Sequence, residues 1–179
     1  MDKDWKTIRE LAGEYAAGNC LNGLNCAEAV LDACIRSAAL DLPLDAVSYM
    51  TGFGGGIGAS GYTCGALTAA VLANGIVHGR KNPGATPKDV RGNELRERFY
   101  KRYNNLTGAF IGLAGSGLCR EIVDQFEKGY ADPANKPNCV RICEEAAKLA
   151  VDFLQIDEDE ADSLAYDMDV VGIRGWTVR

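Results

Sequence analysis

The sequence of 179 residues contains a single histidine, His78. This excludes zinc sites that need two histidine ligands, and also Rieske-type iron–sulfur sites. A Ser-His-Asp or Cys-His triad could use only His78. Because His78 lies at the expected end of a helix, where the helix dipole favours a cation, we interpret it as a surface or capping residue.

The sequence also lacks an excess of basic residues. Its net charge is −6 and its pI is about 4.9, which argues against nucleic acid or an anionic membrane surface as a partner. No basic flank leads an apolar segment at the N-terminus, so we expect no secretory signal. The charge-free segment between Asp45 and Arg80 is interrupted by glycines, and it falls short of the ~20 apolar residues of a membrane span. Seven cysteines in such a chain indicate a reducing compartment, and we expect a cytoplasmic protein.

Strand-like alternation of apolar and polar residues is nearly absent, whereas apolar residues recur at helical spacing. We therefore predict an all-α bundle of six or seven helices with a glycine-rich loop, forming a single domain over residues 1–179. An acidic C-terminal extension begins at about residue 156, and 170–179 is expected to form a short strand or an arm. Seven expected helices cover about 4–17, 25–39, 44–50, 64–77, 86–103, 116–126 and 138–154, and the acidic segment 157–169 is a candidate for one more.

Two segments carry opposite charge. Arg80–Arg102 holds eight Lys or Arg and three acidic residues, and Asp157–Asp169 holds seven acidic residues and no basic one. We favour the interpretation that both are solvated surfaces. The alternative is that they pair, within one chain or between chains, in a contact that salt would weaken.

A run of glycines lies near the middle of the chain. Residues 56–61 match the dinucleotide pattern G-x-G-x-x-G, but no expected strand precedes them and no Asp or Glu follows before Asp89. We interpret the run instead as a loop that passes close to the helix beginning at Cys64. Its residues Gly55, Gly56 and Gly58 could then direct N–H groups at sulfur, stabilising thiolates or cluster sulfides.

Four of the seven cysteines fall in the first turn of an expected helix, following the capping residues Asn25, Thr63, Ser116 and Asn138. The first turn offers free N–H groups and about half a positive charge, and both favour a thiolate. We predict that these four converge in one redox or metal site: Cys26, Cys64, Cys119 and Cys139. Of the others, Cys34 is expected to fill the core, Cys143 to be core or a resolving thiol, and Cys20 carries no signal.

These residues resemble the redox-active protein family named for the pattern C_GCAxxG_C_C. The resemblance is carried by Asn25–Leu31, Gly54–Gly58, Cys64–Thr68, Cys119–Glu121 and Cys139, and it spans about residues 8–155. The chain departs from the family where Cys-Gly-Ala-x-x-Gly ends in Ala69, and in its acidic tail. The resemblance implies a small helical protein with a four-cysteine redox or cluster site.

Three functions remain open from the sequence. The first is thiol–disulfide or electron-transfer chemistry at the four cysteines, with an unidentified redox partner protein. The second is an iron–sulfur cluster held by the same thiolates, with zinc less favoured because no Cys-x-x-Cys is present. The third is a helical interaction module that catalyses nothing. A homodimer is compatible with each.

Overall fold

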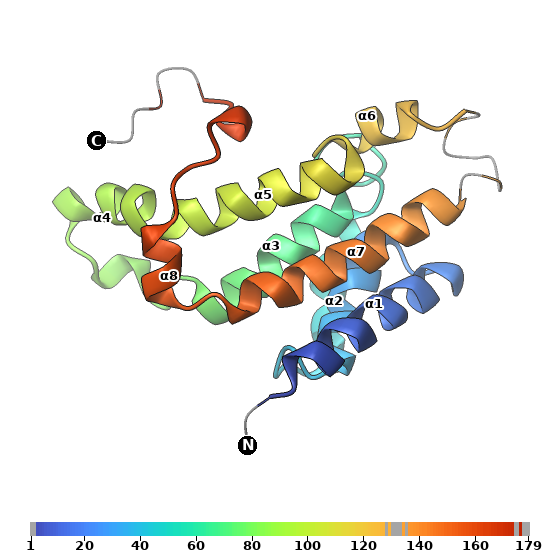
Figure 1. Cartoon of the computed structure of the whole chain (residues 1–179), viewed down its shortest axis with the longest axis horizontal. Helices are drawn as coiled ribbons and strands as arrows, with labels where there is room; N and C mark the ends of the chain where they lie inside the picture. The colour runs from blue at the N-terminus through green and yellow to red at the C-terminus, as the bar shows by residue number, and fades with distance from the viewer. Residues whose placement is uncertain (1–2, 128, 130–133, 135, 174–175, 177–179) are drawn as a thin grey trace.

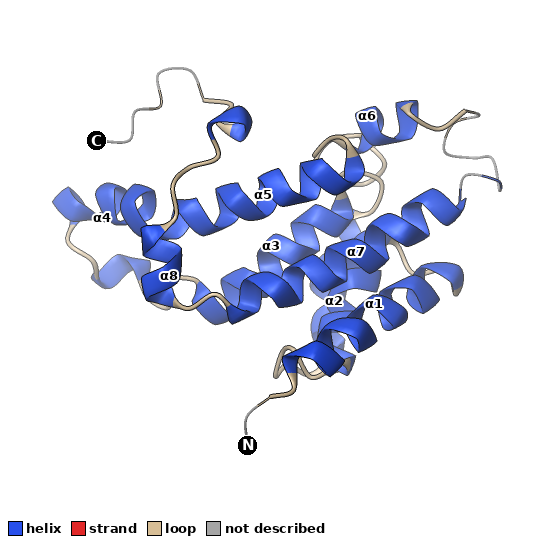
Figure 2. Cartoon of the chain, in the orientation of Figure 1, coloured by secondary structure: helices blue, strands red, loops and turns tan. Residues whose placement is uncertain are grey.

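The computed structural model describes residues 3–127, 129, 134, 136–173 and 176. Within that part of the chain 71% of the structure is helical and there is no strand, which confirms the all-α prediction (Figure 2). The described residues form eight α-helices, of which six have seven residues or more. No helix among them is both long and apolar enough to cross a membrane.

Five long helices form the body of the molecule (Figure 1). They are α1 (Trp5–Leu21), α2 (Cys26–Arg36), α3 (Gly65–His78), α5 (Tyr100–Ala114) and α7 (Lys136–Gln155). Helix α1 packs along α7 and α2, and α3 also packs along α7. Small side chains at the contacts let the helices approach closely, because the fully buried residues include Ala12, Ala16, Ala27, Ala33, Ala66, Ala69, Ala70, Ala73, Ala146, Ala147 and Ala150.

Shorter elements connect these helices: the 3-10 helices η1 (Leu44–Phe53), η2 (Pro83–Ala85) and η5 (Met168–Val170), the π-helix η3 (Leu95–Phe99), and α4 (Lys88–Glu94), α6 (Cys119–Asp124) and α8 (Glu158–Ser163). The prediction of one helix over about 86–103 is wrong in its bounds, because the structure has α4, η3 and α5 there. The structure continues α5 to Ala114 through two glycines, one of which, Gly108, leaves room for the Asp167 side chain. The described part of 170–179 contains no strand.

Helices α3 and α7 run in the same direction. The amide of Asn74 donates to the carbonyl oxygen of Ala150 at 3.2 Å, and Nε2 of His78 lies 3.1 Å from the carbonyl oxygen of Leu154. Both helices therefore begin at one end of the bundle and finish at the other. His78 caps the end of α7, in agreement with its interpretation from sequence.

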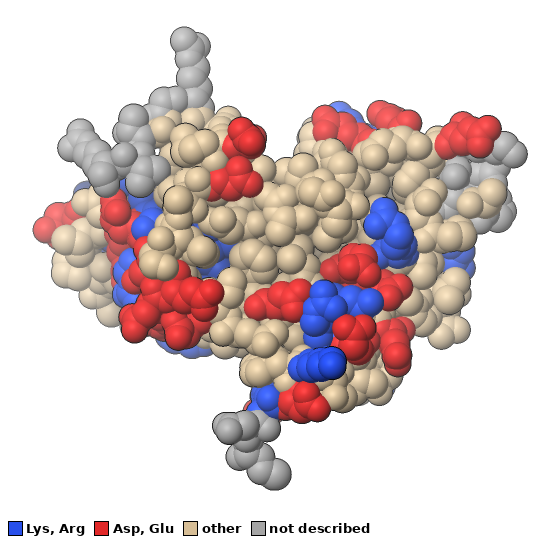
Figure 3. All heavy atoms as spheres, viewed as in Figure 1, with Lys and Arg blue, Asp and Glu red and all other residues tan. Residues whose placement is uncertain are grey.

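The basic and acidic segments pair within the chain. Arg98 contacts Asp162 at 2.9 Å and Glu158 at 3.2 Å, and Lys101 donates to the backbone oxygen of Asp162 at 2.7 Å. Both segments remain largely exposed, as the favoured interpretation expects, and they also pair within the chain, because the tail folds back over α5. Figure 3 shows acidic and basic side chains side by side at this end.

Candidate functional site

A pocket of about 540 Å³ lies where α2, α3 and α7 begin. Apolar side chains from Ile122, Val123 and Phe126 form part of its wall, and Lys136 is the one charged residue among the described residues that line it. Six of the seven cysteines line this pocket: Cys20, Cys26, Cys64, Cys119, Cys139 and Cys143. The structure thus places the four predicted cysteines in one cavity and adds two more.

Cys26 is fixed at the start of α2 by a capping box. The Asn25 side chain accepts from the backbone N–H groups of Ala27 and Glu28, at 2.9 and 3.0 Å, and the Glu28 carboxylate accepts from Asn25 N–H at 3.1 Å. The Asn25 amide also donates to the carbonyl of Thr51, which ties η1 to this helix start. The helix begins where the sequence predicts, because Asn and Glu three residues apart satisfy its free N–H groups.

The sulfur of Cys26 receives several hydrogen bonds. The Cys64 thiol donates to it, and so do the backbone N–H groups of Gly55, Gly65 and Ala27. Together they lower the pKa of Cys26 to about 6, although burial acts in the opposite direction. The same hydrogen bond raises the pKa of Cys64, since its proton is shared with the Cys26 thiolate. The pair therefore holds one negative charge near neutral pH, on Cys26.

The close approach of α3 to Cys26 requires a glycine. A Cβ atom on Gly65 would lie 2.6 Å from the sulfur of Cys26 and 2.8 Å from the carbonyl oxygen of Phe53. With no side chain, the N–H group at the start of α3 reaches the sulfur. This accounts for the glycine that follows Cys64 in the motif.

The glycine loop makes its contacts through different residues. Gly55 N–H points at the Cys26 sulfur, whereas a Cβ on Gly56 would lie 2.7 Å from Cβ of Cys119. Gly58 has no atom within 4 Å of such a Cβ, and only its positive φ of 57° shapes the loop. Of the three predicted glycines, Gly55 directs an N–H group at a sulfur, Gly56 allows a close approach, and Gly58 shapes the turn.

A short antiparallel pairing brings Cys64 next to Cys119. The backbone N–H of Cys64 donates to the carbonyl oxygen of Gly117 at 2.9 Å, and the backbone N–H of Cys119 donates to the carbonyl oxygen of Tyr62 at 2.6 Å. Cys119 is the first residue of α6. The predicted cap Thr63 is wrong, because Cys64 itself occupies the N-cap position of α3 and its side chain makes no capping hydrogen bond.

Cys139 is the fourth residue of α7, which begins at Lys136 rather than at the predicted Asn138. Burial raises the pKa of Cys139 to about 11, with a further rise from the negative charge of nearby Cys26. Burial also raises the pKa of Cys119. These two thiols are therefore protonated at neutral pH when Cys26 is a thiolate.

Sequence reasoning missed a second thiol pair, Cys20 with Cys143. Their side chains hydrogen-bond to each other, and Sγ of Cys143 lies 3.9 Å from the backbone oxygen of Cys26. The i, i+4 spacing of Cys139 and Cys143 agrees with the expected alternative that Cys143 is a resolving thiol, but no local pattern points to Cys20. Cys34 lies outside the pocket in the core, as expected, and burial raises its pKa to about 12.

The comparison with protein families decides the relationship. Residues 24–153 match the model of the family described as "Putative redox-active protein (C_GCAxxG_C_C)". The chain belongs to this family. It has no match among curated proteins and none among solved structures. Membership agrees with the resemblance seen in the sequence, and Ala69, where the family has glycine, is fully buried in α3.

Proposed function

We propose that this member of the C_GCAxxG_C_C family performs thiol–disulfide exchange, with Cys26 as the attacking thiolate and Cys64 as the resolving thiol. The observation that carries the proposal is the set of hydrogen bonds on the Cys26 sulfur, from Cys64 and three backbone N–H groups. A thiolate is the nucleophile in such exchange, and attack is fastest when its pKa is near the ambient pH.

In the proposed reaction the Cys26 thiolate attacks one sulfur of a disulfide in a partner. A Cys26–partner disulfide forms, and the other partner sulfur leaves as a thiolate. The Cys64 sulfur then attacks Cys26, releasing the second partner sulfur, while the Cys64 proton passes to a partner thiolate. The protein loses two electrons and ends with a Cys26–Cys64 disulfide. The partner gains two electrons and ends with one thiol and one thiolate, and the thiolate can take its proton from water.

A metal site at the same cysteines receives less support. Thiolates would suit an iron–sulfur cluster or zinc, but among the described residues no group of three or more Cys, His, Asp or Glu is arranged to hold a metal ion. The proposal therefore routes no step through a cluster. Stoichiometric iron and a brown colour in protein purified without oxygen would favour the cluster instead.

The pH dependence of alkylation tests the proposal. Iodoacetamide reacts with thiolates, so labelling of Cys26, followed by mass spectrometry of its peptide, is expected to have its midpoint near pH 6. Below that pH the rate should fall about tenfold per unit. Cys34 in the same sample serves as the internal control and should stay unlabelled over this range. A Cys26 midpoint at the ordinary value of about 8.5 would contradict the proposal.

A further inference from the structure

We infer that Cys20 and Cys143 form a second dithiol–disulfide couple, which exchanges electrons with Cys26 and Cys64 inside the same pocket. The inference rests on the proposed function for the Cys26–Cys64 pair and extends it. The pocket would then store four electrons rather than two.

The two helices that carry this couple hold its sulfurs together. Cys20 lies in the last turn of α1 and Cys143 lies in the second turn of α7, and these helices pack along each other. The two side chains hydrogen-bond to each other, and both residues line the pocket. Cys143 is 1% exposed, whereas Cys20 is partly exposed and lines the open pocket. Cys20 is therefore the sulfur that a reactant can reach.

The environment of the couple favours a negative charge on Cys20. The Cys143 thiol donates to Cys20, and the pKa of Cys20 is lowered by this hydrogen bond and by the charge of Lys136. The Lys136 ammonium is held nearby by the carbonyl of Leu21, the residue after Cys20, at 3.3 Å. Each pair thus combines one sulfur that favours the thiolate with one that keeps its proton: Cys26 with Cys64, and Cys20 with Cys143.

The two pairs are neighbours in the pocket. Sγ of Cys143 lies 3.9 Å from the backbone oxygen of Cys26, and the charge on Cys26 acts on both Cys20 and Cys143. Exchange between the pairs needs no diffusing carrier, because all four sulfurs face one cavity of about 540 Å³.

The exchange balances without an added reactant. The Cys20 thiolate attacks Cys26 in the Cys26–Cys64 disulfide, and Cys64 leaves as a thiolate. The Cys143 thiol gives its proton to Cys64, and its sulfur then attacks Cys20 in the mixed disulfide and releases Cys26 as a thiolate. Cys20 and Cys143 end oxidised, Cys26 and Cys64 end reduced, and one proton has moved from Cys143 to Cys64.

Thiol counting on the intact protein tests the inference. The reduced chain is treated with excess diamide at low protein concentration, quenched with N-ethylmaleimide in denaturant, and mapped by mass spectrometry. We expect the wild type to lose four of its seven thiols, as Cys26–Cys64 and Cys20–Cys143 disulfides. The Cys20→Ser variant should lose only two, and the matched control Cys34→Ser should still lose four. Circular dichroism melts check that each variant is folded.

Trapping the intermediate tests the exchange itself. The double variant Cys64→Ser/Cys143→Ser removes both proton-holding sulfurs and leaves Cys20 and Cys26. Diamide should convert it to an intramolecular Cys20–Cys26 disulfide, seen as one cross-linked peptide in monomeric protein. Absence of this peptide, with Cys20 and Cys26 both recovered as free thiols, would overturn the exchange.

The outcomes separate this inference from the proposed function. Wild-type protein that loses two thiols, all at Cys26 and Cys64, would overturn the inference and leave the proposed function standing. A disulfide at Cys20–Cys143 with Cys26 and Cys64 still reduced would overturn the proposed function while leaving the second couple. Seven free thiols after diamide would overturn both.

Discussion

The two ends of the helical bundle differ in the charge that their backbone groups favour: negative charge at one end and positive charge at the other. At one end α2, α3, α6 and α7 begin, and their first turns surround a pocket of cysteines. At the other end α3 and α7 finish, and cations meet their last carbonyls. Lys81 donates to Ile76 O at 2.7 Å, and buried Arg102 donates to the carbonyls of Phe153, Ile156 and Asp157 at 2.6, 2.7 and 3.0 Å.

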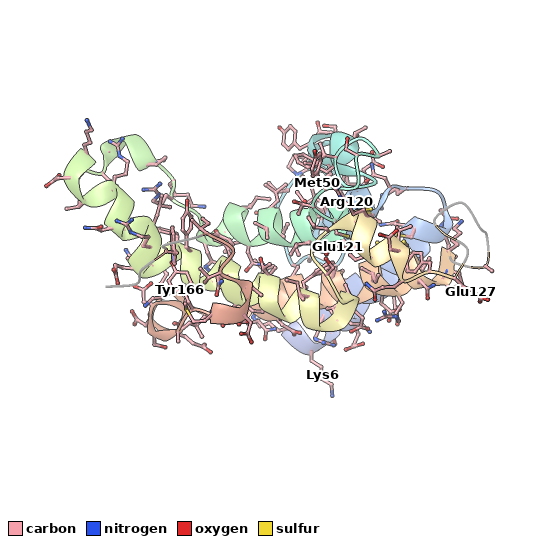
Figure 4. The ribbon with its side chains drawn as sticks, turned by 90° about the horizontal axis from the view of Figure 1, so that it is seen from above. Lys6, Met50, Arg120, Glu121, Glu127 and Tyr166 are labelled. Atoms are coloured by element: carbon pink, nitrogen blue, oxygen red, sulfur yellow. The ribbon has the colours of Figure 1, made fainter. Side chains whose placement is uncertain are left out.

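This difference follows from the parallel packing of α3 and α7. A helix carries about half a positive charge at its start and half a negative charge at its end. Parallel helices therefore collect donors at one end and acceptors at the other. We call the end with the cysteine pocket the thiol end, and the end where α3 and α7 finish the cation end. In Figure 4 the labelled Arg120 and Glu121 lie towards the thiol end, and Tyr166 lies towards the cation end. The sulfur chemistry and the buried arginine are two consequences of the same arrangement.

Among the changes considered, replacing Arg102 at the cation end should lower the stability of the protein most. Arg102→Met keeps an apolar side chain in the space but leaves the carbonyls at the end of α7 without their donors. We expect a loss of about 3 kcal/mol in the free energy of unfolding, measured by urea denaturation. Arg141→Met, on the exposed face of α7, is the control and should change stability by less than about 0.5 kcal/mol. Equal effects of the two changes would contradict the capping role.

Gly65→Ala should break the thiol end in the same manner. The added Cβ would meet the Cys26 sulfur and displace the Gly65 N–H group that stabilises its charge. We expect the pKa of Cys26 to rise towards about 8.5, and its alkylation rate at pH 6.5 to fall about tenfold or more.

The control for that change is Gly52→Ala, because a Cβ on Gly52 would have no atom within 4 Å and Gly52 has no positive φ. In the Gly52→Ala variant, Cys26 should be alkylated at the same rate as in the wild type. A Gly65→Ala protein that is folded and still titrates near pH 6 would show that Gly65 does not stabilise the thiolate.

How far the sequence predicts this arrangement depends on how local the signal is. Asn25 with Glu28 predicts the start of α2 because a capping box uses only neighbouring residues. The starts at Cys64 and Cys139 were misplaced by one or two residues, since no such box marks them. The continuation of α5 to Ala114 was missed because its glycines are compensated by contacts with the distant tail, such as Gly108 with Asp167.

Within the site, the pair of Cys20 and Cys143 could not be predicted from local sequence patterns. Cys20 has no capping signal, and it joins Cys143 only because α1 packs along α7. Such a contact between residues far apart in the chain is set by tertiary packing, which no local pattern reports. Cysteines at helix starts can be predicted from local capping patterns, whereas a cysteine in the last turn of a helix, such as Cys20, cannot.

The thiol end also contains a run of strained backbone in its glycine loop. Residues 55–59 all have positive φ, including Ala59 at 63°, a conformation that costs a residue with a Cβ about 1–2 kcal/mol. Ala59→Gly should therefore stabilise the protein by about 0.5–1 kcal/mol after the entropy of glycine is subtracted. Thermal unfolding measures this. Ser60→Gly, at a position without positive φ, is the control and should give no gain.

The smallest expected effect concerns the exposed ion pair of the cation end, Arg98 with Asp162. Both side chains are over a third exposed, so water screens the attraction that burial would strengthen. A double-mutant cycle of Arg98→Ala and Asp162→Ala should give a coupling of about 0.5 kcal/mol at low salt, falling towards zero near 1 M. The cycle of Arg98→Ala with Asp159→Ala is the control, because Asp159 is not among the ion-pair partners of Arg98 in the described structure. A coupling above about 2 kcal/mol that persists in salt would contradict this expectation, because an ion pair this exposed should contribute far less.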